Sequence, residues 1–90
     1  MDFIEVTADR NNEKLKTMIC IDNIISISEY GGKSKQALIC IQQQNGEKMT
    51  LKCIESYRIV KKRLYEVIND KEYKKIELFG NDGLRKEIRG

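Results

Sequence analysis

The stretch from Thr50 to Ile68, TLKCIESYRIVKKRLYEVI, constrains the fold more than any other part of the chain. It begins with the alternation of a β-strand and changes at Glu55-Ser56 to the spacing of an amphipathic helix. At about 100° per residue, its apolar side chains fall on one narrow stripe. Because the segments before this stretch are patterned as strands, we expect the helix to pack on a sheet. The stripe consists of Tyr57, Val60, Leu64, Val67 and Ile68.

The first third of the chain is patterned as strands separated by polar turns. Residues 3–7 alternate, residues 9–14 are polar, and two isoleucine-rich runs at 18–21 and 24–27 follow. The β-branched isoleucines favour strands over helices. In the second run Ile25 and Ile27 are predicted to share the buried face, with Ser26 and Ser28 on the opposite face.

A β-hairpin is the clearest local signal. It is predicted from Gln36 to Ile54, because Asn45-Gly46 accepts positive φ at both central positions of a two-residue turn. The second arm places Met49, Leu51 and Cys53 on one face, which we expect to be the core face. Ser56 then follows as the predicted N-cap of the helix, since its hydroxyl can accept from early backbone amides.

Together these segments predict an α+β fold: a small antiparallel sheet or roll of about five strands, packed by one C-terminal helix. Residues 1–70 are expected to form a single sheet-plus-helix domain, with the helix ending near Asn69-Asp70. Residues 71–90 form a C-terminal extension. Its segment Lys75 to Phe79 alternates weakly, which allows an added strand or hairpin, while residues 84–89 are open between strand, short helix and loop.

Composition narrows the class of protein further. The 90 residues carry a net charge of only +3, so binding to nucleic acid is allowed but not required. No apolar run approaches the roughly 20 residues that cross a bilayer, so we expect no membrane insertion and a cytoplasmic location. The three cysteines, Cys20, Cys40 and Cys53, lack CxxC spacing and lie in apolar strand patterns, which predicts core or near-core thiols.

The segments FIEVT (3–7), ICIDNIISISE (19–29) and NGEKMTLKCIESYRIV (45–60) resemble the short FlbD-type proteins linked to flagellar and swarming motility. The resemblance covers roughly residues 3–68, with Glu55-Ser56 at the start of the helix. It implies a small sheet-plus-helix accessory protein, and it carries over no catalytic residues. This chain differs in having a first turn, residues 8–15, that looks longer than the family's tight turn, and residues 70–90 have no counterpart.

The chain offers little for enzymatic chemistry. It has no histidine, and its acidic residues are scattered singly among lysines, so we expect no catalytic site, no metal site and no cofactor. The segment Gly31-Gly32-Lys33-Ser34 lacks the spacing of a phosphate-binding loop. No small-molecule substrate is evident. The prediction is therefore a non-enzymatic accessory module that binds a protein partner or itself.

Two kinds of contact residue are predicted. Ile59 and Tyr65 lie outside the apolar stripe of the helix and are candidates for contact with a protein partner or a second copy of the chain. The alternative function is nucleic-acid binding through the basic helix and the C-terminal extension. Its candidate contact residues are Arg58, Lys61, Lys62, Arg63, Lys74 and Lys75.

Overall fold

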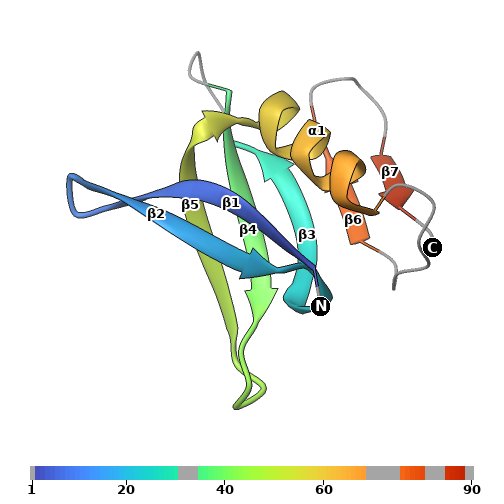
Figure 1. The fold of residues 1–90 in the computed structure, drawn as a ribbon, viewed down its shortest axis with the longest axis horizontal. Coiled ribbons are helices and arrows are strands. Elements are labelled where there is room, and N and C mark those ends of the chain that lie inside the picture. Colours follow the sequence, from blue (N-terminus) through green and yellow to red (C-terminus); the bar gives the residue numbers. More distant parts are fainter. Residues whose placement is uncertain (1, 31–34, 69–75, 81–84, 89–90) are drawn as a thin grey trace.

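The computed structural model describes residues 2–30, 35–68 and 76–80, together with the backbone of 85–88. These residues form one mixed sheet and one α-helix (Figure 1). The strand order is β2-β1-β5-β4-β3-β6-β7. The elements along the chain are β1 (Phe3–Arg10), β2 (Glu13–Cys20), the short 3-10 helix η1 (Ile21–Asn23), β3 (Ile24–Glu29), β4 (Gln36–Gln42), β5 (Lys48–Ser56), α1 (Tyr57–Ile68), β6 (Ile76–Phe79) and β7 (Arg85–Ile88).

This arrangement confirms the α+β fold class and the C-terminal helix. The C-terminal extension adds a hairpin, because β6 and β7 pair in antiparallel register. One pairing differs from an all-antiparallel sheet: β6 lies parallel to β3, with Ile27 opposite Leu78. A parallel neighbour requires a crossover instead of a tight turn. Here α1 lies between β5 and β6 in the chain and provides part of that crossover.

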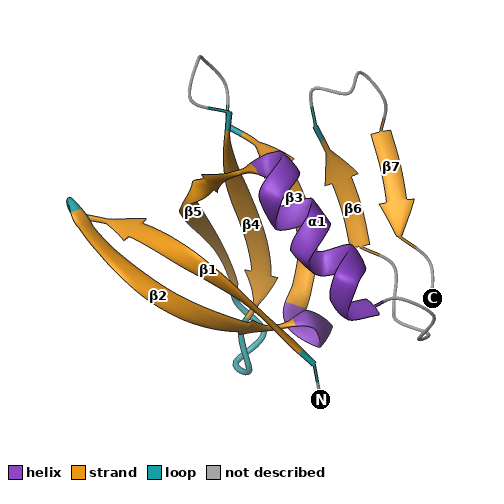
Figure 2. Ribbon diagram, turned by 45° about the horizontal axis from the view of Figure 1, so that its top comes forward, coloured by secondary structure: helices purple, strands orange, loops and turns teal. Residues whose placement is uncertain are grey.

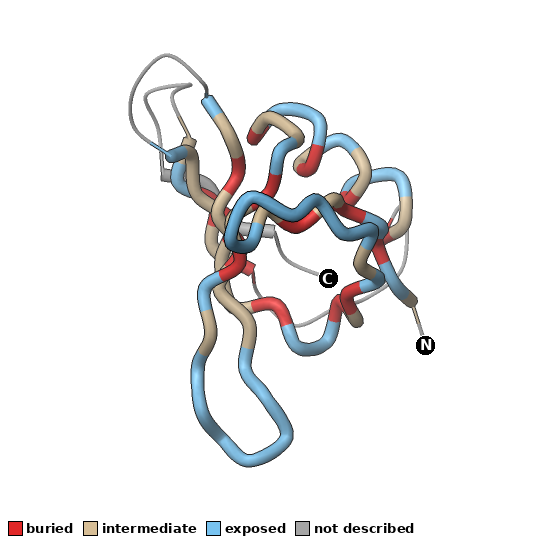
Figure 3. The backbone as a smooth tube through the Cα atoms, turned by 90° about the vertical axis from the view of Figure 1, so that its left-hand side faces the viewer, coloured by how far each residue is buried: buried red, intermediate tan, exposed pale blue. Residues whose placement is uncertain are grey.

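The core lies between the β3-β4-β5 part of the sheet and two elements that cover its concave side. The β1–β2 hairpin crosses in front of β5 and β4, and α1 lies beside this hairpin over β3 (Figures 1 and 2). Every described element from β1 to β6 contributes to a single apolar cluster. Figure 3 shows the buried residues as red segments spread along the chain. The buried residues are Ile4, Val6, Ala8, Ile19, Ile21, Ile24, Ile27, Ala37, Ile39, Leu51, Cys53, Tyr57, Val60, Leu64, Ile68, Ile76 and Leu78.

The helix follows the predicted stripe. Tyr57, Val60, Leu64 and Ile68 are buried, and Val67 is half-buried against the same core. The predicted N-cap is also confirmed, because the backbone N–H of Ile59 donates to the hydroxyl of Ser56 at 3.3 Å. The described helix ends at Ile68. The expected end at residues 69–70 lies outside the described part of the chain.

The two hairpins use different turns from those expected. Asn11 and Asn12 both have positive φ, 49° and 67°, so the two-residue turn joins β1 to β2. Gly46 has a φ of 88°, whereas Asn45 is not in the left-handed region. The prediction of two positive φ values at Asn45-Gly46 is therefore wrong. The first turn is also tighter than its polar sequence suggested, because β1 extends to Arg10 and β2 begins at Glu13.

The β4–β5 connection, residues 43–47, is closed by two backbone hydrogen bonds. The N–H of Gly46 donates to the carbonyl of Gln43 at 2.9 Å, and the N–H of Gln43 donates to the carbonyl of Glu47 at 2.7 Å. This combination is typical of a type I turn followed by a residue in the left-handed region. The predicted core face of β5 is confirmed, since Leu51 and Cys53 are buried and Met49 is half-buried.

In β3 a register shift changes the predicted faces. The pairing with β4 shifts between Ile24 and Ser26, which is the mark of a bulge. As a result Ile24 and Ile27 are buried, whereas Ile25 is only half-buried. The prediction that Ile25 and Ile27 share the buried face is therefore wrong, because strict alternation does not allow for the extra residue.

Within the described residues, no helix is both long and apolar enough to span a membrane.

Candidate functional site

Strands β1 and β5 meet along a short seam on the concave side of the sheet. In the described residues these strands pair through Ala8 and Cys53 alone. On the side of this pair nearer α1, the carboxylate of Glu55 on β5 links the two strands by hydrogen bonds to Thr7 of β1. Its Oε1 and Oε2 accept from the backbone N–H of Thr7 at 2.8 and 2.9 Å, and Oε2 also accepts from the Thr7 hydroxyl at 3.0 Å. A side chain thus takes the place that a strand carbonyl would have in a regular ladder.

Arg63 connects the same carboxylate to the helix. Its Nη1 donates to Oε2 of Glu55 at 3.1 Å and to the carbonyl of Glu5 at 2.8 Å. The Glu55 side chain is 12% exposed and that of Arg63 is 41% exposed, so the ion pair lies at the boundary of the core. We call Thr7, Glu55 and Arg63 the Glu55 cluster. It joins β1, β5 and α1 at one end of the seam.

The electrostatics of the Glu55 cluster favour an ionised carboxylate at neutral pH. Burial on its own would raise the pKa of Glu55, but the hydrogen bonds from the Thr7 N–H, from its own backbone N–H, from the Thr7 hydroxyl and from Arg63 outweigh it. The pKa of Glu55 is therefore lowered from its ordinary value of 4.5. A carboxylate held in this way accepts hydrogen bonds and does not exchange protons near neutral pH. Its role is to position strands.

The neighbouring thiol of Cys53 is equally fixed in one protonation state. Burial, followed by the negative charge of Glu55, raises its pKa to about 12. Because the thiolate is the reactive form, this thiol is a poor nucleophile at neutral pH. Cys20 and Cys40 are half-buried and, like Cys53, are not joined in disulfides. Among the described residues, no group of three or more Cys, Asp or Glu side chains is placed to hold a metal ion.

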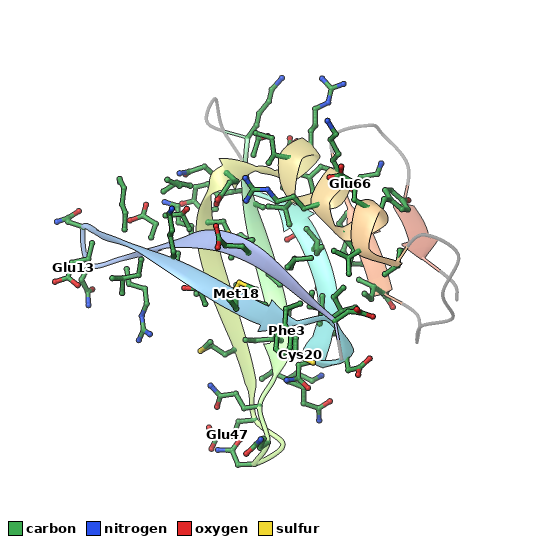
Figure 4. All side chains as sticks on the ribbon, viewed as in Figure 1. Phe3, Glu13, Met18, Cys20, Glu47 and Glu66 are labelled. Atoms are coloured by element: carbon green, nitrogen blue, oxygen red, sulfur yellow. The ribbon has the colours of Figure 1, made fainter. Side chains whose placement is uncertain are left out.

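At the other end of the seam, an open cleft of about 220 Å³ lies between the β1–β2 hairpin and the β4–β5 hairpin. Figure 4 shows Met18 and Cys20 on β2, where this strand passes in front of β4 and β5. Most of the lining is apolar, with Arg10, Thr17 and Asn23 as its polar members. The lining residues are Ala8, Arg10, Leu15, Thr17, Met18, Ile19, Cys20, Asn23, Ile41, Met49 and Leu51.

Two open strand edges flank this cleft. β2 is the terminal strand of the sheet and has β1 on one side only. In β5, Lys48 to Lys52 pair with β4, and the described part of the chain places no strand on their other side. Leu15 and Met18 on β2 are 49% and 59% exposed, which is unusual for large apolar side chains in a strand. The cleft therefore combines apolar surface with backbone groups available for pairing.

The residues predicted as protein contacts lie elsewhere. Ile59 and Tyr65 are exposed on α1, as expected from the helical wheel, but neither lines the cleft. Being six residues apart, they are separated by about 120° around the helix, so they do not form one patch. The ammonium group of Lys61 lies 5.8 Å from the ring centroids of both Tyr57 and Tyr65, so Tyr65 already has a cation on its ring.

The residues predicted as nucleic-acid contacts have different surroundings in the described structure. Arg63 belongs to the Glu55 cluster, and Lys61 packs over the two tyrosine rings. Arg58 and Lys62 are exposed on α1. Lys74 and Lys75 lie outside the described residues. Arg58 and Lys62 are thus the two most exposed of these four helix residues, whereas a nucleic-acid surface needs an extended basic stripe.

Sequence reasoning missed both the Glu55 cluster and the cleft. Thr7 and Glu55 are 48 residues apart, and no local pattern predicts their contact. A weak signal for the cleft does exist in the segment EKLKTMIC, where Leu15 stands between two lysines and Met18 follows them. In a strand, this spacing leaves apolar side chains on both faces of an edge.

Comparisons of this chain with protein families, with curated proteins and with solved structures find no match. The FlbD-type resemblance therefore rests on its sequence pattern alone. The structure adds one geometric fact about that pattern: Thr7, at the end of its first segment, and Glu55, before the helix, are hydrogen-bonded to each other.

Proposed function

We propose that this chain is a small, non-enzymatic protein-interaction module that binds an extended polypeptide segment in the cleft beside β2. The observation that carries the proposal is the apolar cleft flanked by two unpaired strand edges. A strand added to an open edge gains main-chain hydrogen bonds, and pockets for its alternate side chains provide selectivity. The cleft supplies such a pocket next to β2, between Leu15 and Met49.

The size of the cleft supports a peptide side chain over a cofactor. Pockets for small molecules usually measure about 300–1,000 Å³. At about 220 Å³ this cleft is smaller, and it is open to solvent. The lowered pKa of Glu55 and the raised pKa of Cys53 also leave the seam without a group for acid-base or thiol chemistry at neutral pH. Recognition by shape and backbone pairing fits these features better than catalysis does.

The setting of this function follows from the sequence. The FlbD-type resemblance implies an accessory role in motility, and three cysteines without a disulfide are consistent with work in the cytoplasm. Both are parts of the same proposal. The partner segment is defined by its chemistry: it is extended, it exposes an unpaired backbone, and it carries at least one aliphatic side chain for the cleft.

Solution NMR of the labelled protein, titrated with decapeptides selected from a random displayed library, tests the proposal. We expect amide shifts confined to β2 and to residues 48–52 of β5. Leu15→Asp and Met18→Asp should weaken peptide binding at least tenfold, whereas the matched helix variants Ile59→Asp and Tyr65→Asp should not. Shifts that cluster on α1 would contradict the proposal. So would binding of single-stranded oligonucleotide that is lost in an Arg58→Glu, Lys62→Glu double variant.

A further inference from the structure

We infer that the segment that pairs with β2 is β2 of a second copy of this chain, in an antiparallel dimer with Thr17 on the two-fold axis. This inference rests on the proposed function and names its partner. It follows from which backbone groups of β2 face outward, from the symmetry of the pairing, and from the charges along the strand.

The outward-facing backbone groups can be assigned from the Glu55 cluster. The N–H of Thr7 donates to Glu55 of β5, so it points away from β2. Thr7 lies opposite Lys16 in the β1–β2 register. In an antiparallel ladder both members of such a pair direct their N–H and C=O groups outward. The backbone N–H and C=O groups of Lys16 therefore face the open edge. Because the pattern repeats every two residues, those of Lys14 and Met18 do so too.

Symmetry limits the register of a β2–β2 pair. A two-fold axis perpendicular to the sheet keeps the cleft side of both copies on the same side, so each residue must pair with one from its own face. The cleft-side face of β2 contains Leu15, Thr17 and Ile19, which lie opposite the core residues of β1. The axis must then pass through a residue of β2. Near the middle of the strand, the candidates are Lys16, Thr17 and Met18.

Charge and length select one of these three registers. An axis at Lys16 places two lysines directly opposite each other, which is destabilising. An axis at Met18 pairs only residues 16–20, because β2 ends at Cys20. An axis at Thr17 pairs residues 14–20 and places Lys16 opposite Met18 of the second copy. No like charges are directly opposite in this register.

The same register uses the exposed apolar side chains of the edge. Leu15 lies opposite Ile19 of the second copy on the cleft side, so the two clefts become neighbours across the axis. Met18 is the most exposed large apolar residue of the described chain. In the dimer it covers the aliphatic stem of Lys16 of the second copy. Lysines at a sheet edge normally oppose association. Here they discourage other registers and leave this one open.

The expected dimer is reversible. A contact made by one eight-residue strand and its neighbouring side chains falls at the small end of specific interfaces. Sedimentation of the untagged protein should therefore show the mass rise with concentration, from 10.5 kDa toward twice that value. Met18→Pro removes an outward-facing N–H and should hold the mass at that of the monomer. Circular dichroism should show that this variant is folded, since proline is tolerated on edge strands.

Disulfide trapping tests the register directly. In a Cys20→Ser, Cys40→Ser background, Thr17→Cys would place two thiols in a non-hydrogen-bonded pair, where Cα atoms are about 4.5 Å apart and a disulfide can form. We expect covalent dimer in a glutathione redox buffer to form at least tenfold faster for Thr17→Cys than for Lys62→Cys, an exposed control on α1. Lys16→Cys should cross-link more slowly than Thr17→Cys.

The outcomes separate the two proposals. A constant mass of 10.5 kDa at millimolar concentration, with Thr17→Cys no faster than the helix control, would overturn self-pairing. Faster cross-linking of Lys16→Cys would overturn the register. In either case, peptides that still bind at β2 would leave the proposed function standing. The proposed function fails if neither peptides nor a second copy contact β2.

Discussion

The two ends of the β1–β5 seam have opposite chemistry. At the end near α1, an ionised carboxylate with a 12% exposed side chain is held by Thr7 and Arg63. At the other end, Leu15 and Met18 are about half exposed beside an apolar cleft. A half-buried charged side chain is thus hydrogen-bonded at one end, and apolar surface is left open at the other. Folding alone does not require this distribution, and we interpret the closed end as a brace that holds the open end in shape.

The largest test of this contrast compares two leucines. Leu64 on α1 is fully buried, so Leu64→Ala should lower the free energy of unfolding by about 2–5 kcal/mol. Leu15→Ala in the cleft should change it by about 0.5 kcal/mol or less, because this side chain is already half exposed. Urea denaturation followed by circular dichroism measures both. Equal losses would show that the cleft is part of the core.

A second test concerns the closed end, where Gly80 packs against Tyr57. A β-carbon at position 80 would overlap the ring of Tyr57, which is buried at the start of α1. Gly80→Ala should therefore lower the free energy of unfolding by about 1–3 kcal/mol. Gly46→Ala is the control, since its β-carbon meets open space and only its φ of 88° opposes the change, at about 1 kcal/mol. A smaller loss at Gly80 than at Gly46 would contradict the packing.

The third test weakens the brace itself. Glu55→Gln keeps the shape of the side chain but removes its charge and one acceptor, so the Thr7 N–H and Arg63 lose part of their hydrogen bonding. We expect a loss of about 1–2 kcal/mol in thermal or urea unfolding. Glu5→Gln is the matched control, because the Glu5 side chain is exposed and Arg63 contacts only its backbone carbonyl. If the two variants are equally stable, the Glu55 cluster does not brace the seam.

The smallest expected effect is the pH dependence of the same brace. The folded-state pKa of Glu55 lies below the ordinary value of 4.5, so the unfolded chain takes up its proton first as the pH falls. The stabilisation is complete above pH 4.5 and is lost as the pH falls through the folded-state pKa. Urea midpoints of the wild type and Glu55→Gln should therefore converge on acidification. A constant difference between pH 7 and pH 3 would contradict the lowered pKa.

The sequence predicted those parts of the fold that depend on neighbouring residues. The helical stripe, the Ser56 cap and the core face of β5 follow from periodicity and capping chemistry, and all three are confirmed. The bulge at Ile25 and the choice of turn at Asn11-Asn12 depend on how β3 and β1 meet their partners, so local pattern did not reveal them. The parallel β3–β6 pair joins strands that are far apart in the sequence, so local pattern did not reveal it either.

The candidate site was less predictable than the fold. The exposure of Ile59 and Tyr65 was predicted, but the cleft involves two hairpins that diverge beyond the Ala8–Cys53 pair. Divergence of strands is a property of the assembled sheet and leaves little trace in composition. Only the position of Leu15 between lysines hinted at it.

The position of Cys53 makes the chain its own reporter of seam opening. Its thiol is fully buried at the one residue pair that joins β1 to β5 in the described structure. An alkylating reagent can reach this sulfur only after the first hairpin has lifted away from β5. The rate of Cys53 labelling, read against that of Cys20 and Cys40, would thus measure how often the core around this pair opens, without any engineered cysteine.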